Sequence, residues 1–194
     1  MKAFLLAAAA ALLTAACATT AEDEMGEGAG MAPAGMPAPE YVGTAASSDL
    51  FEIQSGQLAL QRSCDPAVRS FAQMIVDDHR RMSGQLMQAA QSAGLPPPPM
   101  QMAPQHQDML QRLQTSGPGF EAAFRDGQVM AHQEALELHR GFAEEGDEPA
   151  LRGVASQAVP AIQMHLSQAQ NLPATARCAA PAPEPGERRR GERG

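Results

Sequence analysis

Residues 73–82 read QMIVDDHRRM, and this stretch decides the fold because it lies in the middle of a long apolar stripe. Apolar residues recur every three to four positions on both sides of it, which is the pattern of a helix with one buried face. The stripe consists of Val68, Ala72, Ile75, Met82, Leu86 and Ala89. The position that the stripe lacks is occupied by His79, and Asp78 lies one step round the helix. A titratable side chain therefore takes a core position.

The same spacing predicts helices, and no strand, through the middle of the chain. Four long helices are expected at about 40–62, 66–93, 120–145 and 148–171, with a short helical piece at 105–113. Gly94 and the prolines that follow it end the second helix, and Pro160 is expected to kink the last one. Two helical hairpins joined by one long connection predict an all-α fold, a four-helix bundle spanning residues 40–172.

Histidines also fall on the apolar faces of two other predicted helices. His132 shares a face with Leu136, and His165 follows an apolar stripe that ends at Ile162. The first helix offers Glu52 instead. At about 1.5 Å per residue, Glu52, His79 and His132 lie at similar depths, about 18–22 Å from their hairpin turns.

Several titratable groups at one depth of a core need a shared explanation, because burying each alone is costly. One explanation is a metal site for iron, zinc or copper, with imidazole and carboxylate ligands. Its candidate ligands are Glu52, Asp78, His79, His132 and His165. A second is a hydrogen-bonded Asp/Glu–His network that fixes the register of the helices. A third is that some of these side chains face solvent.

The N-terminus carries the features of an export signal. Lys2 precedes an apolar run that is too short to span a bilayer, and small residues lead to Cys17. Residues 14–17 (TAAC) resemble a bacterial lipobox, which predicts a lipoprotein signal peptide at 1–16 and a membrane anchor on Cys17. Because an alanine follows the cysteine, the expected destination in the cell envelope is the outer membrane, facing the periplasm. Ordinary secretion is the alternative.

Two segments outside the bundle are rich in small residues and proline. Residues 17–39 are predicted to form a flexible tether, and residues 173–194 a disordered tail. The formal net charge of −8 argues against nucleic acid, which requires a basic surface. The sequence contains no nucleophile elbow, phosphate-binding loop or zinc-protease helix, so we expect a non-enzymatic protein with an unidentified protein partner.

Methionines and one further histidine suggest weaker alternatives. Met100, Met102 and Met109 cluster with His106 in the long connection, and thioethers favour Cu(I). No dense methionine array appears, so we expect Met109 to pack on the bundle and the others to have no site. His139 lies near the end of its helix and is expected to be solvated.

Four stretches together resemble the bacterial family catalogued as domain of unknown function 4142. They are YVGTAASSDLFEIQSGQLAL, VRSFAQMIVDDHRRM, GQVMAHQEALELH and VPAIQMHLSQAQ, and they cover about residues 40–172. The resemblance implies a ferritin-like bundle in which the long connection crosses the length of the molecule. Ferritin-like di-iron sites use Glu-x-x-His motifs, but Val76 and Ile162 replace the glutamates here. Ferroxidase chemistry is therefore not expected.

The resemblance also bears on the cysteines. If Cys17 carries lipid, Cys64 and Cys178 remain as an even pair. The crossover topology implies that the last helix ends beside the first hairpin turn, so a Cys64–Cys178 disulfide is expected. The sequence as a whole predicts an envelope-anchored lipoprotein with a binding or stress-related structural function. The alternative is a metal-binding or redox bundle.

Overall fold

The computed structural model describes residues 35–98 and 100–178, and within them it is helical without strands. The elements are α1 (Ala38–Arg62), α2 (Pro66–Ser92), α3 (Pro104–Thr115), a short 3₁₀ turn (Gly117–Gly119), α4 (Phe120–Glu145) and α5 (Pro149–Gln170). The all-α four-helix bundle predicted from the sequence is confirmed. The predicted signal peptide, Cys17, most of the tether and residues 179–194 lie outside the described residues.

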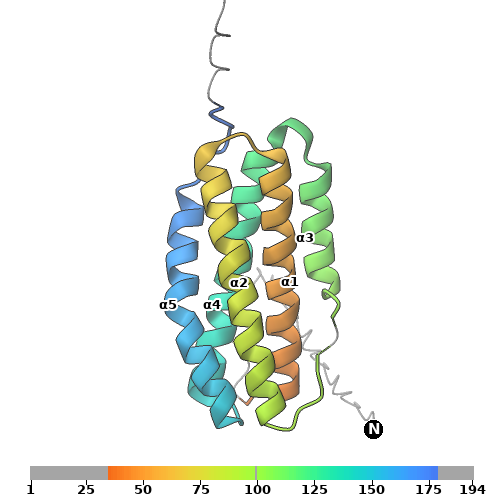
Figure 1. Cartoon of the computed structure of the whole chain (residues 1–194), viewed down its shortest axis with the longest axis vertical. Coiled ribbons are helices and arrows are strands. Elements are labelled where there is room, and N and C mark those ends of the chain that lie inside the picture. Colours follow the sequence, from red (N-terminus) through yellow and green to blue (C-terminus); the bar gives the residue numbers. More distant parts are fainter. Residues whose placement is uncertain (1–34, 99, 179–194) are drawn as a thin grey trace, which may run out of the picture.

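The four long helices form two hairpins joined by the segment that contains α3 (Figure 1). In the bundle α1 packs on α2 and α4, while α5 packs on α4 and α2. The α3 helix lies along the outside of α1 and runs back toward the α1–α2 turn, so α4 starts at that end. As the resemblance implied, the last helix therefore ends beside the first hairpin turn.

The helix ends agree with the sequence to within two residues, and this difference is reached at the start of α1 and at the end of α3. The α1 helix begins at Ala38 and not at Glu40. Pro39 is tolerated in its first turn, because a missing N–H there breaks no helical hydrogen bond. Asp65 caps α2 by accepting from the amides of Ala67 and Val68, at 2.9 and 3.3 Å. The α5 helix continues through Pro160. No helix in the described residues is both long and apolar enough to cross a membrane.

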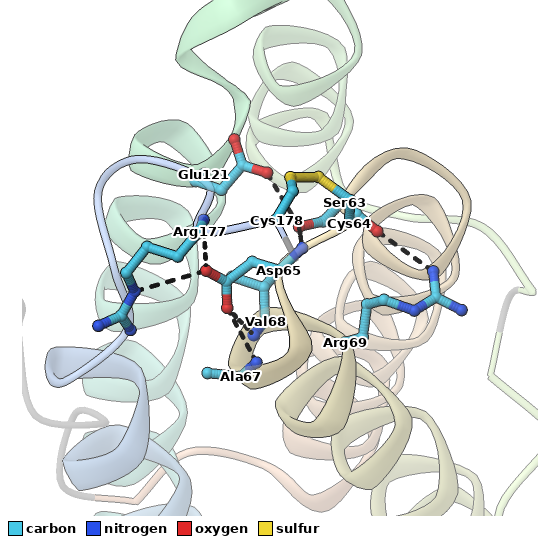
Figure 2. Close-up of a disulfide and its surroundings, with 9 residues drawn as sticks. All are labelled: Ser63, Cys64, Asp65, Ala67, Val68, Arg69, Glu121, Arg177 and Cys178. Carbon is cyan, nitrogen blue, oxygen red and sulfur yellow. Dashed lines mark hydrogen bonds and ion pairs between the residues drawn. A yellow bond between two sulfur atoms is a disulfide. The ribbon is translucent and has the colours of Figure 1, made fainter. Parts of the chain in front are cut away.

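The disulfide between Cys64 and Cys178 closes the bundle at the α1–α2 turn (Figure 2). The two Cα atoms are 5.2 Å apart across a sequence separation of 114 residues. The amide of Arg177 also donates to Asp65 at 2.7 Å, so the segment after α5 is bonded to the same turn twice. The expected cysteine pairing is confirmed.

The core of the bundle has apolar layers at both ends. One layer gathers around Tyr41 and Phe142, whose rings stack at 3.9 Å, and the other around Phe71 and Phe124. Between them, buried polar side chains from all four long helices face one another. This polar layer consists of Asp49, Glu52, Ser55, His79, Gln128, His132 and His165. The candidate site lies in this layer.

Candidate metal centre

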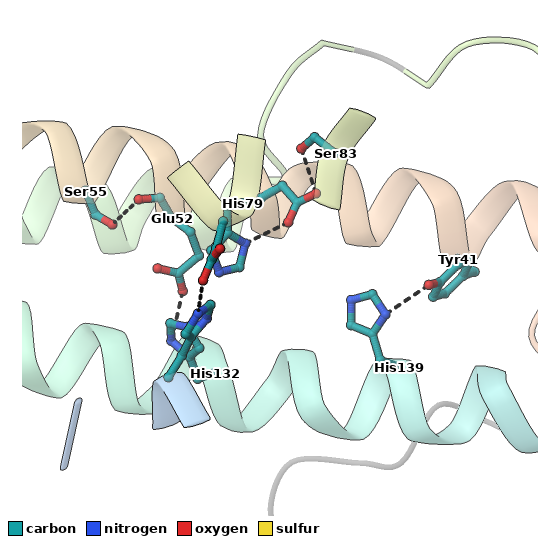
Figure 3. A network of polar contacts seen from close by, with 10 residues as sticks. Tyr41, Glu52, Ser55, His79, Ser83, His132 and His139 are labelled. Atoms are coloured by element: carbon teal, nitrogen blue, oxygen red, sulfur yellow. Dashed lines mark hydrogen bonds and ion pairs between the residues drawn. The ribbon is translucent and has the colours of Figure 1, made fainter. Parts of the chain in front are cut away.

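Three buried histidines meet at mid-depth in the bundle, and two of them, His79 and His132, are labelled in Figure 3. His79 comes from α2, His132 from α4 and His165 from α5, and their exposed fractions are 2%, 0% and 0%. One ligand nitrogen from each ring lies within 4.8 Å of those from the other two. The ring centroids are 5.3–5.6 Å apart in all three pairs. The apolar stripes placed all three histidines on core faces, while the estimate of a common depth covered only His79 and His132 among them.

Each of the three rings has one nitrogen in a hydrogen bond. The contacts are His79 Nδ1 to Asp49 Oδ1 at 2.8 Å, His132 Nδ1 to the Gln128 carbonyl at 2.8 Å, and His165 Nε2 to Asp78 Oδ2 at 2.9 Å. Because a carbonyl oxygen only accepts, Nδ1 of His132 must carry the proton. The second nitrogen of every ring is buried without a hydrogen-bond partner: Nε2 of His79, Nε2 of His132 and Nδ1 of His165.

The two predicted carboxylate ligands lie on the outer side of the histidines. Asp78 contacts His165 as described, and Glu52 Oε1 is 3.3 Å from Nδ1 of His132. Neither belongs to the group of ligand atoms within 4.8 Å of one another. Both carboxylate oxygens of Glu52 are buried without a hydrogen-bond partner. In this geometry Asp78 orients the ring of His165. Direct ligation by Asp78 or Glu52 stays a prediction.

Two of the three rings are held neutral. Burial lowers the pKa of His165, and burial together with the neighbouring histidines lowers the pKa of His132 well below its usual value. Burial also lowers the pKa of His79, but the hydrogen bond and charge of Asp49 outweigh it, so this pKa is raised. Burial raises the pKa of Glu52 to about 7. Neutral imidazoles are the form that binds metal ions.

His139 is buried, and the expectation that it is solvated was wrong. Its exposed fraction is 9%, and its Nδ1 is 2.9 Å from the hydroxyl of Tyr41 (Figure 3). Seven residues after His132 the helix presents the same face again, and Tyr41 at the start of α1 supplies a partner there. Burial lowers the pKa of His139 to about 4. This pair forms a second polar group, displaced from the three histidines along the bundle toward the end where α1 starts.

Two of the three methionines in the long connection pack in one apolar group, and the third is exposed. Met109 packs with Phe51 as expected, and Met102 is buried in the same group, whereas Met100 is 79% exposed. His106 is buried and its Nδ1 is 2.6 Å from the hydroxyl of Ser47 on α1. That contact fastens α3 to the bundle, which gives His106 a structural role.

Comparison with known proteins places the chain in a family. Residues 24–172 match the family described as a domain of unknown function, DUF4142. The chain belongs to this family. No curated protein matches its sequence. The resemblance noted in the sequence is therefore confirmed, and it brings no biochemical role with it.

Solved structures with a similar fold include two of CopM. CopM in its Cu(II)-bound form superposes with a TM-score of 0.61 at 18% identity, covering 71% of this chain and 95% of that one. CopM in its silver-bound form, obtained by co-crystallisation, gives a TM-score of 0.59 at 17% identity, covering 70% and 94%. At these identities the likeness establishes the fold of this DUF4142 protein.

Proposed function

We propose that this DUF4142 protein binds one divalent transition-metal ion at His79, His132 and His165. The observation that carries the proposal is that each of these buried rings has one nitrogen hydrogen-bonded and the other without a partner. A ligand histidine has this arrangement, since it binds the metal through one nitrogen and donates from the other to a carboxylate or carbonyl. The role is binding, with no catalytic step assigned.

A purely structural hydrogen-bond network fits the site less well. A network that fixes helix register would satisfy both nitrogens of each ring, because an unpaired buried polar atom costs about 1–3 kcal/mol. Here three ring nitrogens and both oxygens of Glu52 lack partners. A cation at the centre would satisfy the three nitrogens at once.

The charges around the histidines favour a divalent over a monovalent ion. The carboxyl groups of Asp49 and Asp78 contact the rings of His79 and His165, and of these two only Asp78 has an arginine partner. A double positive charge would compensate this buried negative charge. Imidazole ligands suit zinc, copper and iron. Cu(II) is the first ion to test, because CopM has a similar fold in a Cu(II)-bound form. Glu52 is a candidate for a fourth ligand, because both of its carboxylate oxygens are buried without a hydrogen-bond partner.

We place this binding function in the cell envelope. The signal at 1–16 and Cys17 support a lipid anchor in the outer membrane, and the Cys64–Cys178 disulfide suits an oxidising compartment. The anchor has a direct test. A Cys17→Ser variant should leave the membrane fraction for the soluble fraction, whereas an unchanged distribution would exclude lipidation as the anchor.

Metal content tests the binding function. The purified protein is loaded with Cu(II) or Zn(II), desalted and measured by elemental mass spectrometry. We expect close to one ion per chain in the wild type and none in His79→Gln or His132→Gln. His106→Gln is the matched control, because His106 is equally buried but lies outside the cluster. Loss of metal in the control alone, or no metal in the wild type, would contradict the proposal.

A structural role for the polar layer, without metal, is the second candidate, and the buried carboxyl group of Glu52 is the observation that favours it. Its buried carboxyl group, with a pKa raised to about 7, is largely protonated at slightly acid pH and could then donate to a neighbour. If the wild type holds no metal while both histidine variants are strongly destabilised, the polar layer is structural. The search for a binding or stress-related role would then move to the surface of the bundle.

A further inference from the structure

The three histidines have no direct exposure through which an ion could reach them. His79, His132 and His165 are at most 2% exposed, and Glu52 is 1% exposed. Among the side chains hydrogen-bonded or ion-paired to the rings, Asp49 is 9% exposed and Asp78 is 21% exposed. Asp78 is therefore the partner that reaches solvent furthest.

Asp78 bonds inward and outward at the same time. Its Oδ2 accepts from Nε2 of His165 at 2.9 Å, while its Oδ1 accepts from the guanidinium of Arg81. The side chain of Arg81 is 58% exposed. One carboxylate thus connects a buried imidazole to an exposed guanidinium on the surface, at the place where α2 faces α5.

We propose that the ion enters between α2 and α5 by binding first to the carboxylate of Asp78. In doing so it displaces the guanidinium of Arg81 from that carboxylate. This inference rests on the proposed metal site and adds its loading route. An incoming cation replaces the guanidinium on Asp78, so the carboxylate remains paired throughout. From Asp78 the next group inward is the ring of His165.

A second route to the histidines is conceivable, but it provides no charged group for a cation. A small pocket of about 60 Å³ is lined by Ala46, Leu50, Ser83, Leu86, Met87 and Met100. One of its lining residues, Ser83, donates its hydroxyl to Asp49 at 2.7 Å. None of its lining residues is charged, so a divalent ion would lose hydration there without a compensating charge. The thioethers of Met87 and Met100 in its lining would instead select soft monovalent ions.

Uptake kinetics separate these routes. The chain has one tyrosine and no tryptophan, so quenching of Tyr41 fluorescence by Cu(II) reports binding in a stopped-flow experiment. Tyr41 contacts His139, which is about 10 Å along α4 from His132. The variants are Arg81→Gln, Arg80→Gln and the double change Met87→Leu with Met100→Leu. Arg80 is exposed and adjacent, so its variant removes the same charge without touching Asp78.

We expect Arg81→Gln to take up Cu(II) about threefold faster than Arg80→Gln at low ionic strength, since it lacks the competing guanidinium. Release should accelerate by a similar factor, so the dissociation constants of the two variants should agree within about twofold. Such agreement is expected when a substitution changes the entry route and leaves the binding site unchanged. The methionine variant should match the wild type.

Equal uptake rates in the two arginine variants would overturn the route, and so would slower uptake in the methionine variant alone. Equilibrium dialysis of wild-type protein with Cu(II) distinguishes this failure from that of the metal site itself. If the wild type binds one ion while Arg81→Gln and Arg80→Gln take it up at equal rates, only the displacement of Arg81 and the route past Asp78 are rejected. An absence of binding rejects the site and the route together.

Discussion

The carboxylate of Asp49 lies 2.8 Å from Nδ1 of His79, although 30 residues separate them in the chain. The other oxygen of Asp49 accepts from the hydroxyl of Ser83 at 2.7 Å, so the carboxylate is fixed at both ends. It therefore fixes the orientation of the His79 ring, whose Nε2 has no hydrogen-bond partner. Asp49 orients a proposed ligand without itself belonging to the group of ligand atoms.

Replacing Asp49 by Asn should weaken metal binding without abolishing it. The amide keeps the size of the side chain but loses the charge that favours the His79 proton at Nδ1, and such outer partners typically contribute about 10- to 100-fold in affinity. A competition titration against a chromophoric chelator measures the change. Asp77→Asn is the control, because Asp77 is exposed and bonds only Gln73 among the described residues. Equal affinities in both variants would remove Asp49 from the site.

Gly56 should not tolerate a side chain. A Cβ at this position would lie 2.8 Å from Cγ2 of Val76 and 3.1 Å from the backbone oxygen of Ala72, where α1 and α2 are in close contact. We expect Gly56→Ala to destabilise the protein by about 1–3 kcal/mol.

Gly43 provides a control for that substitution on the same helix, because a Cβ there meets nothing within 4 Å. Gly43→Ala should stabilise the protein by about 0.5–1 kcal/mol through the higher helix propensity of alanine. Urea denaturation measures both free energies of unfolding. Similar effects of the two changes would mean that the α1–α2 contact can relax.

The sequence predicted which residues face the core better than it predicted their partners. A stripe with helical period fixes the direction of a side chain, so His79, His132 and His165 were placed correctly from the sequence alone. The acceptors come from other helices or from the backbone, as with Asp49 and the carbonyl of Gln128. Their positions depend on the rotation and offset of packed helices, which no single stripe encodes.

The assignment of His139 failed for a related reason. Its place near a helix end suggested that its side chain is exposed to solvent. It lies seven residues after His132, however, and therefore on the same face of the helix. Tyr41, its partner, lies 98 residues away and packs there because α1 starts at the same end of the bundle. The disulfide was accessible to prediction because the resemblance supplied the topology, and the topology decides which chain ends meet.

Reduction of the Cys64–Cys178 disulfide should lower stability substantially. Closing a loop with a sequence separation of 114 residues is worth about 4–5 kcal/mol in the chain-entropy model, and measured values are commonly about 2–4 kcal/mol. A Cys64→Ser/Cys178→Ser variant should therefore melt at a lower temperature than the oxidised protein. It should also lose the response of its melting temperature to reductant. A melting temperature equal to that of the oxidised wild type would contradict this.

His139 should make the folded state sensitive to acid. Its pKa is lowered from 6.5 to about 4 by burial, so between these values the unfolded chain binds a proton that the folded chain does not. The contribution of His139 is present above pH 6.5 and is lost as the pH falls toward 4. At 1.36 kcal/mol for each unit of pKa, the loss amounts to about 3 kcal/mol.

A His139→Gln variant lacks this titration and keeps a polar group beside Tyr41. Urea unfolding followed by Tyr41 fluorescence at a series of pH values measures the effect. The wild type should lose about 3 kcal/mol relative to the variant between about pH 7 and pH 4, whereas parallel stability curves would show that His139 titrates normally in the folded protein.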